Sequence, residues 1–384
     1  MSTLSPDALC EAARAETGCD DFGGESFREG LKVLTHALET EAELSALGRK
    51  IAHGHVRRLL ADRLRIVDWL RRYPEIERQE VPGPVFMIGL PRTGTTALAA
   101  LLALDPERRA LATWESASPI PPPETSTRAT DPRIATTQAG IDGLHAILPE
   151  MRAMYDSTAS GSTECQDLLG MEFRTHHFCG QYWVPSYAAW QRDCDMEPAY
   201  RHHRRVLQLL QWRSPPNRWH LHSPVHMLSL DALLEVYPDA RFLWTHRDPA
   251  AVLGSVCSLI ASMLSLGSER RDPAGLGQAQ VAIWTEALAR AIRFRERVGE
   301  ERFADVSFGP LAADPVATVE RAYTRLGLVL DPAGGAAMAK WAAANPRGRH
   351  GEHRYQLADF GLDPAAVRAR FAFYSKRFDV AAES

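Results

Sequence analysis

The sequence predicts an α/β fold in which helices flank a parallel β-sheet, with a helical extension at the N-terminus. Short apolar runs at residues 85–90, 219–222 and 240–245 have the length and composition of buried parallel strands. Each run is followed by a stretch with helical spacing, and strands that alternate with helices are typical of a parallel sheet. The first eighty residues show helical spacing alone, which separates them from the sheet-forming part.

The helical extension is predicted from two periodic stretches. Leucines and other apolar residues recur at helical spacing over residues 31–38 and again over residues 56–70. Six arginines lie between residues 57 and 72, in the helix that the second stretch predicts, and we interpret them as a solvated helix face. Because a Pro-Gly-Pro break at residues 82–84 ends the pattern, we predict an extension over residues 1–80 and a second part over residues 81–384.

The second part contains further predicted elements. Residues 118–133 are rich in Pro, Ser and Thr and predict a loop, and residues 302–308 predict another strand. Residues 173–190 are rich in aromatic side chains, which either pack in the core or line an apolar ligand pocket. Helices are predicted near residues 94–102, 138–155, 199–212, 227–237, 316–326 and 333–344, and from residue 249 onward.

Composition narrows the class of protein. The chain has 384 residues, of which 45% are hydrophobic and 24% charged, so a mainly disordered chain is excluded. The net charge of −4 gives no reason to expect a nucleic-acid partner. Without a signal-peptide pattern, an apolar stretch of membrane-spanning length or metal-ligand cysteine spacing, we expect a cytoplasmic protein with no membrane span and no bound metal. Oligomeric state is not readable from the sequence, and a homodimer is left open.

A loop of glycine and threonine follows the first predicted strand. Residues 91–96 read Pro-Arg-Thr-Gly-Thr-Thr, and the next helix begins at the glycine. Backbone N–H groups, hydroxyls and a helix N-terminus therefore converge, which favours a phosphate ligand, and Arg92 adds a bidentate guanidinium. The loop has no lysine and so is not a Walker A motif. Taken alone, it is also consistent with a plain strand-to-helix turn.

A second motif follows the strand predicted at residues 240–245. Arg247 leaves the carboxyl end of this strand, and Ser255 lies about two helical turns further on. Ligands of open parallel sheets bind at these strand ends, so the pair suits a second phosphate. Arg247 alone would be equally consistent with an ion pair to Asp248 or another acid.

These motifs together resemble the sulfotransferases that use 3′-phosphoadenosine 5′-phosphosulfate (PAPS). The resemblance is strongest to a bacterial branch with the pattern L-P-R-T-G-T-T, then W-E and a proline run, then S-P-x-H and T-H-R-D-P. It covers roughly residues 85–378. The matching stretches are residues 90–96, 114–115, 119–123, 223–226, 245–249 and 345–351.

The resemblance implies a P-loop-like fold and makes residues 81–384 a PAPS-dependent sulfotransferase domain. Such an enzyme moves a sulfuryl group to a hydroxyl of a small-molecule acceptor and releases the bisphosphate PAP, without a metal. The 5′-phosphosulfate would be held by Arg92, Thr93, Gly94, Thr95 and Thr96. The 3′-phosphate would be held by Arg247 and Ser255 under a basic loop of Arg347, Gly348 and Arg349.

Sulfuryl transfer in line with the leaving phosphate needs a cation and a general base. Arg92 and the loop amides are expected to stabilise the leaving oxygen, and a base must take the acceptor's proton. We favour Glu115 as the base, with His222 and His226 as alternatives and Glu164 as a weaker one. Many relatives carry lysine where His222 stands, so any charge that it supplies here would depend on pH.

Two other functions are compatible with part of the pattern. A P-loop kinase or NTPase would need a loop lysine, a Walker B carboxylate and magnesium. A non-catalytic nucleotide-binding module would bind PAP yet release no sulfated product. The acceptor is not identified, and a phenol, a lipid alcohol, a polyketide and a sugar all stay open.

Overall fold

The computed structural model describes residues 4–154, 157–215, 218–345 and 355–383. Its centre is a five-stranded sheet with strand order β2-β3-β1-β4-β5, in which every neighbouring pair is parallel. The predicted α/β class and parallel sheet are thereby confirmed. The strands are β1 (Val85–Gly89), β2 (Arg109–Ala110), β3 (Trp219–His222), β4 (Arg241–His246) and β5 (Phe303–Ser307).

The sheet separates two hydrophobic clusters because successive side chains of a strand point to opposite faces. In β1, Phe86 and Ile88 join the larger cluster, while Val85 and Met87 join the smaller one. The smaller face is covered by α4 (Thr95–Leu102), α16 (Pro315–Arg325) and α17 (Pro332–Ala344). The larger face is covered by α11 (Glu197–Gln211), α12 (Leu230–Val236), α13 (Pro249–Ser265) and α14 (Pro273–Val298).

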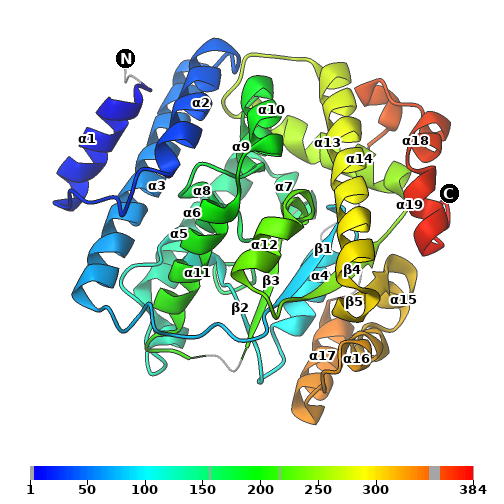
Figure 1. Ribbon diagram of the computed structural model, residues 1–384. Helices are drawn as coiled ribbons and strands as arrows, with labels where there is room; N and C mark the ends of the chain where they lie inside the picture. Colours follow the sequence, from blue (N-terminus) through cyan, green and yellow to red (C-terminus); the bar gives the residue numbers. More distant parts are fainter. Residues whose placement is uncertain (1–3, 155–156, 216–217, 346–354, 384) are drawn as a thin grey trace.

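The helical N-terminus predicted from spacing is confirmed as α1 (Pro6–Thr17), α2 (Phe27–Thr40) and α3 (Ala46–Arg72). These helices lie on the opposite side of the molecule from α18 and α19, the blue and red ends of Figure 1. Their apolar side chains belong to the same continuous cluster as β1 and β4. The predicted boundary at residue 80 thus does not coincide with a break in the core, and it stays a prediction.

The expected solvated arginine face of α3 is wrong for Arg63. This side chain is only 2% exposed, and its guanidinium pairs with Glu172 at 2.6 Å and donates to the Phe22 carbonyl oxygen at 2.8 Å. A buried charge needs a partner of opposite sign. Spacing along α3 does not reveal that partner, because Glu172 lies more than a hundred residues away.

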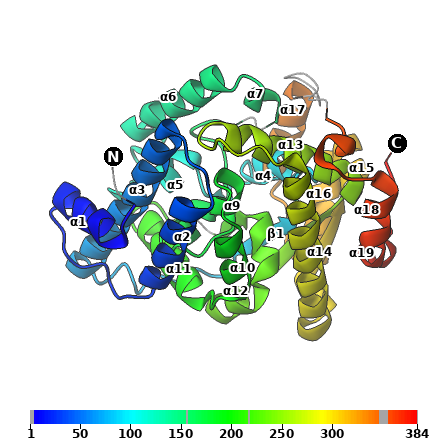
Figure 2. The ribbon, with the colours of Figure 1, turned by 90° about the horizontal axis from the view of Figure 1, so that it is seen from above.

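Most predicted helices are present within a few residues of their expected bounds, but α14 was not predicted. It begins after Asp272, whose side chain accepts a hydrogen bond from Gly275 N at 2.9 Å. In Figure 2, α14 lies beside α13, and the two helices are in contact.

No helix among the described residues is long and apolar enough to cross a membrane. The remaining α-helices of the described residues are α5 (Thr113–Ala117), α6 (Pro132–Ile147), α7 (Met151–Met154), α8 (Gln166–Gly170), α9 (His177–Gln181), α10 (Pro185–Asp193), α15 (Phe308–Ala313), α18 (Pro364–Arg370) and α19 (Ala372–Phe378).

Two glycines of α3 provide a test of how it packs. A Cβ at Gly48 would overlap the backbone of Gly267, directly after α13, whereas a Cβ at Gly54 would meet no atom within 4 Å. Gly48→Ala should therefore lower the free energy of unfolding by about 1–3 kcal/mol. Gly54→Ala, the control, should raise it by about 0.5–1 kcal/mol through helix propensity. Urea unfolding measures both, and a neutral Gly48→Ala would contradict the close α3–α13 contact.

Candidate active site

The loop after β1 is fastened to the neighbouring strand β4. The hydroxyls of Thr93 and Thr245 are hydrogen-bonded at 2.6 Å, and the Thr93 hydroxyl also lies 2.7 Å from the Leu90 carbonyl oxygen. Thr93 is completely buried. Its side chain thus holds the loop in place, and only its backbone is available to a phosphate.

The loop adopts an unusual backbone at two positions. Arg92 has a φ of 65° and Gly94 a φ of 89°, both in the left-handed region. A non-glycine residue in this region costs about 1–3 kcal/mol and is found mostly at functional sites. Gly94 is the N-cap of α4 and gives the first N–H groups of this helix no side-chain hydrogen bond. The hydroxyls of Thr95 and Thr96 have no hydrogen-bond partner within the described part of the chain.

The structure brings the two predicted phosphate motifs together. Arg92 Nε donates to Ser255 Oγ at 3.1 Å, and Arg247 Nη1 donates to the Arg92 carbonyl oxygen at 3.0 Å. These groups come from the loop after β1, from α13 and from the end of β4. The arrangement places two guanidiniums and a hydroxyl at the carboxyl edge of adjacent strands, where open α/β sheets bind their ligands.

Arg247 already holds a carboxylate. Its Nε and Nη2 donate to the two carboxylate oxygens of Glu383 at 2.7 and 2.8 Å. The guanidinium also stacks 4.0 Å above the Phe308 ring. The same segment is anchored through Glu383 N, which donates to Asp248 at 2.9 Å. Arg247 is therefore positioned to grip an anion in the bidentate manner. The predicted basic loop of Arg347, Gly348 and Arg349 lies outside the described residues.

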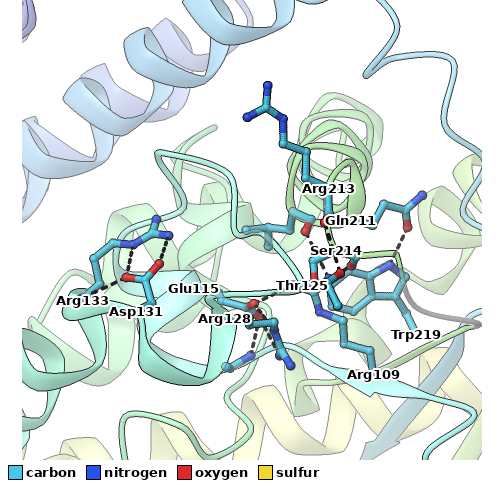
Figure 3. A network of polar contacts seen from close by, with 12 residues as sticks. Arg109, Glu115, Thr125, Arg128, Asp131, Arg133, Gln211, Arg213, Ser214 and Trp219 are labelled. Atoms are coloured by element: carbon cyan, nitrogen blue, oxygen red, sulfur yellow. Dashed lines mark hydrogen bonds and ion pairs between the residues drawn. The ribbon is translucent and has the colours of Figure 1, made fainter.

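Glu115, the favoured base, is completely buried in a network of arginines (Figure 3). Arg109 and Arg128 donate to its Oε1 at 2.5 and 2.8 Å, and Ala112 N donates to its Oε2 at 3.2 Å. Arg109 also donates to the carbonyl oxygens of Leu210 and Ser214. The carboxylate thereby joins β2, α5 and the end of α11.

The electrostatics of Glu115 oppose its use as a base. Burial alone would raise its pKa, but Arg109 and Arg128 outweigh that effect and hold the pKa below its usual range. Glu115 is also absent from the walls of the cavity beside the phosphate loop, although Ser116 is among them. Its geometry fits a structural ion-pair centre rather than a group that takes a proton from a ligand.

Neither predicted histidine reaches that cavity. His226 is completely buried, and its Nδ1 hydrogen-bonds Tyr200 Oη at 2.8 Å within the larger core cluster. His222 borders a separate cavity of about 10 Å³ between β3 and α4. Burial lowers the pKa of His222 to about 4, so the ring is neutral at pH 7 and supplies no positive charge.

A cavity of about 340 Å³ opens beside the phosphate loop. Its wall includes Pro91 of the loop and Glu164, a residue between α7 and α8. Helix α13 contributes apolar side chains to the wall, among them Val256, Leu259 and Ile260, and several other elements supply both apolar and polar residues. Apolar walls with a few polar groups are typical of small-molecule sites.

Two carboxylates, Glu164 and Asp167, line this cavity, and Asp167 is paired with Arg58. Ser223 Oγ and Gln166 Nε2 both donate to Oε2 of Glu164 at 2.9 Å. No hydrogen bond to Oε1 occurs among the residues that the structure describes, so this oxygen is available to a ligand. Burial raises the pKa of Glu164, and the two neutral donors only partly offset this effect. From the sequence Glu164 is a weaker candidate than Glu115, and its contacts with Gln166 and Ser223 become visible only in the fold.

The aromatic-rich segment divides between the two predicted roles. Phe173, Phe178 and Tyr187 are completely buried in the core. The polar members His176, His177 and Gln181, with which the aromatic residues alternate, line the cavity instead. The segment stands out in the sequence for its aromatic content, but no Phe, Tyr or Trp of residues 173–190 lines this cavity.

The site therefore combines two arginines at the carboxyl edge of an α/β sheet with an adjoining cavity. A family model described as "Sulfotransferase family" matches residues 84–332. The chain therefore belongs to the sulfotransferase family. This result confirms the family resemblance and disfavours both a P-loop kinase and a non-catalytic binding module.

Similar proteins agree with this assignment. Sulfotransferase STF1 from Mycobacterium tuberculosis, whose crystal structure is known, is 34% identical to this chain in sequence. The two structures match with a TM-score of 0.87, and the match covers 97% of this chain and 99% of STF1. Sulfotransferase STF9 from Mycobacterium avium is 31% identical, with a TM-score of 0.89 over 99% of this chain and 98% of that one. A curated relative is the omega-hydroxy-beta-dihydromenaquinone-9 sulfotransferase Stf3 of Mycobacterium tuberculosis, 23% identical over 269 residues. That match spans 64% of this chain and 63% of the relative's length.

The arginine network predicts a stability role for Glu115. Glu115→Gln leaves two guanidiniums without a counter-charge and should lower the free energy of unfolding at pH 7 by about 3–5 kcal/mol. The folded-state pKa is lowered, so the carboxylate stabilises the fold above its unfolded pKa and loses this effect as the pH falls. The difference from wild type, measured by urea unfolding, should shrink towards low pH. The exposed Glu320→Gln is the control, and equal stability of both variants would contradict the role.

Proposed function

We propose that this chain transfers a sulfuryl group from PAPS to a hydroxyl of an apolar small molecule and releases PAP. One observation carries the proposal. A mostly apolar cavity is bordered both by Pro91 of the phosphate loop and by a carboxylate, Glu164, that has one oxygen available. A donor held at the loop would thus present its reactive end to an acceptor in the cavity, close to a base.

The donor contacts follow from the charges that the fold assembles. Arg92, the amides at the start of α4 and the hydroxyls of Thr95 and Thr96 would hold the 5′-phosphosulfate. Arg247 and Ser255 would hold the 3′-phosphate, with Arg347, Gly348 and Arg349 proposed to cover it. The carboxylate of Glu383, which Arg247 now binds bidentately, stands in for an anion and shows that the guanidinium suits one.

The proposed reaction is a single displacement at sulfur. Glu164 accepts the proton from the acceptor hydroxyl, and the acceptor oxygen forms a bond to sulfur. The bond between sulfur and the bridging oxygen of the phosphosulfate breaks, and its electron pair leaves with PAP. Arg92 and the loop amides stabilise the charge that grows on the leaving oxygen. His222 and His226 take no part in this scheme.

The apolar cavity favours an apolar acceptor over a sugar. The relative Stf3 is named for an omega-hydroxy menaquinone, an apolar molecule with a terminal hydroxyl. We infer that this chain also acts on an apolar alcohol or phenol. The apolar side chains of α13 would replace water around its body, which contributes about 25 cal/mol for each Å² buried.

Donor binding can be tested with two variants that should change the affinity for PAP in opposite directions. Arg247→Ala removes a charged donor pair and should weaken PAP binding about 10- to 100-fold. Glu383→Gln removes a carboxylate that competes for Arg247, and since the ion pair is partly exposed, PAP binding should become about two- to fivefold tighter. Isothermal titration calorimetry measures both. A thermal shift with ATP-Mg but none with PAP would overturn the donor assignment.

The base can be tested by Glu164→Gln. Turnover should fall by about 10²- to 10⁴-fold while PAP affinity and melting temperature stay near wild type. Because the carboxylate must be ionised to accept a proton, the wild-type kcat should rise with pH through the raised pKa of Glu164. In Glu164→Gln this rise of kcat with pH should be absent. Full activity in Glu164→Gln would return the role to another residue.

A further inference from the structure

A second cavity, of about 390 Å³, lies behind the one described above. The two share Asp167, His177, Gln181 and Met263 in their walls. Side chains that border both spaces form a partition one residue thick. The far cavity thus adjoins the first one across these shared side chains, and helix α3 lines its other side.

The far wall comes from the N-terminal helices. Ile51, Gly54, His55 and Arg58 of α3 line it, and all four lie before residue 84, where the family match begins. Among the residues that the structure describes, none from α3 lines the first cavity. The helical extension therefore supplies part of the space next to the acceptor cavity, beyond the part of the chain that defines the family.

The partition carries an unsatisfied polar group. Gln181 Nε2 lies 2.8 Å from His177 Nε2, whereas Gln181 Oε1 is buried without a hydrogen-bond partner within the described part of the chain. A buried amide oxygen left without a donor is destabilising, because it loses its hydrogen bond to water and gains none. If the amide is rotated, its NH₂ group is left instead. A polar atom of a ligand that enters between the shared side chains would satisfy this group.

The far cavity is polar but not strongly charged. Arg58 pairs with Asp62 at 3.4 Å and with Asp167 at 3.2 Å, so two carboxylates face one guanidinium. Burial lowers the pKa of His55 to about 3, and this ring is neutral at pH 7. Tyr182 Oη lies 3.3 Å from His55 Nδ1 and adds a neutral polar group. A neutral hydrogen-bonding end of a ligand suits this site better than a carboxylate or phosphate.

We propose that the two cavities form one acceptor channel, in which α3 and Gln181 select an elongated alcohol with a neutral polar group at its far end. The inference rests on the proposed function, which places the reacting hydroxyl beside Glu164. The apolar body of the acceptor lies along α13, its chain passes Gln181, and its distal carbonyl, amide or hydroxyl meets Arg58 and His55. The N-terminal extension thereby sets the length and the polarity of the acceptor.

The channel can be blocked at Gly54. A side chain at this position points into open space, because a Cβ there meets no atom within 4 Å. Gly54→Phe should fill part of the far cavity without disturbing the helix. Gly140→Phe is the matched control, since Gly140 is an exposed helical glycine with equally open surroundings on α6.

Three probes separate the effect of acceptor length from the effect of charge at its far end. They are 12-hydroxydodecanamide, 12-hydroxydodecanoic acid and the short 4-hydroxybutanamide. Equilibrium binding is measured with and without PAP, so the result does not depend on turnover or on the donor. Wild type should bind the long amide at least about tenfold more tightly than either other probe. Gly54→Phe should lose that advantage and leave the short amide unchanged, whereas Gly140→Phe should match wild type.

Two results would overturn the channel. One is equal affinity of wild type for the long and short amides, and the other is undiminished binding of the long amide by Gly54→Phe. A preference for the acid over the amide would reject the neutral end group. PAP titrations of the same proteins separate this question from the proposed function. If wild type does not bind PAP, the donor assignment is refuted. If Gly54→Phe binds PAP as wild type does but binds the long amide weakly, the effect of the substitution is confined to the channel.

Discussion

The hydrogen bond between Thr93 and Thr245 determines where the candidate site can form. Parallel pairing sets Gly89 opposite Thr245, and a side chain at Gly89 would clash with the Thr245 hydroxyl. The absent side chain lets the loop after β1 fold back over the end of β4. Arg92 and Arg247, which follow these two strands, are thereby brought into contact. The anion grip is a consequence of strand register rather than of either motif alone.

Glu115 and Glu164 are both buried, but their surroundings shift their pKa values in opposite directions. Glu115 receives hydrogen bonds from two arginines and a backbone N–H, and its pKa is lowered. Glu164 receives hydrogen bonds from two neutral side chains on one oxygen, and its pKa is raised. Positive charge stabilises a carboxylate and makes it a poor proton acceptor, whereas burial among neutral donors has the opposite effect. The first therefore suits stability, and the second suits proton transfer.

The N-terminal helices connect stability to specificity. Helix α3 contacts the chain beyond α13 through the close approach of Gly48 and Gly267, and the same helix walls the far cavity through Gly54. Helix α13 in turn carries Ser255 towards Arg92 and lines the near cavity. Helix α3 and the chain around α13 thus adjoin both the two arginines of the candidate site and the two cavities. A change in their spacing would be felt at both ends of the reaction.

The sequence by itself determined four of the five strands, the N-terminal helices, the family and the order of the two phosphate motifs, but not the two-residue edge strand β2. These depend on local spacing and short motifs, such as residues 91–96 and the interval from Arg247 to Ser255. Only the tertiary structure decided that Glu115 pairs with Arg128, that Glu164 faces the cavity and that Glu383 lies on Arg247. Charge pairing, burial and cavity shape depend on residues distant in the chain, and these leave no periodic signal for the sequence to show.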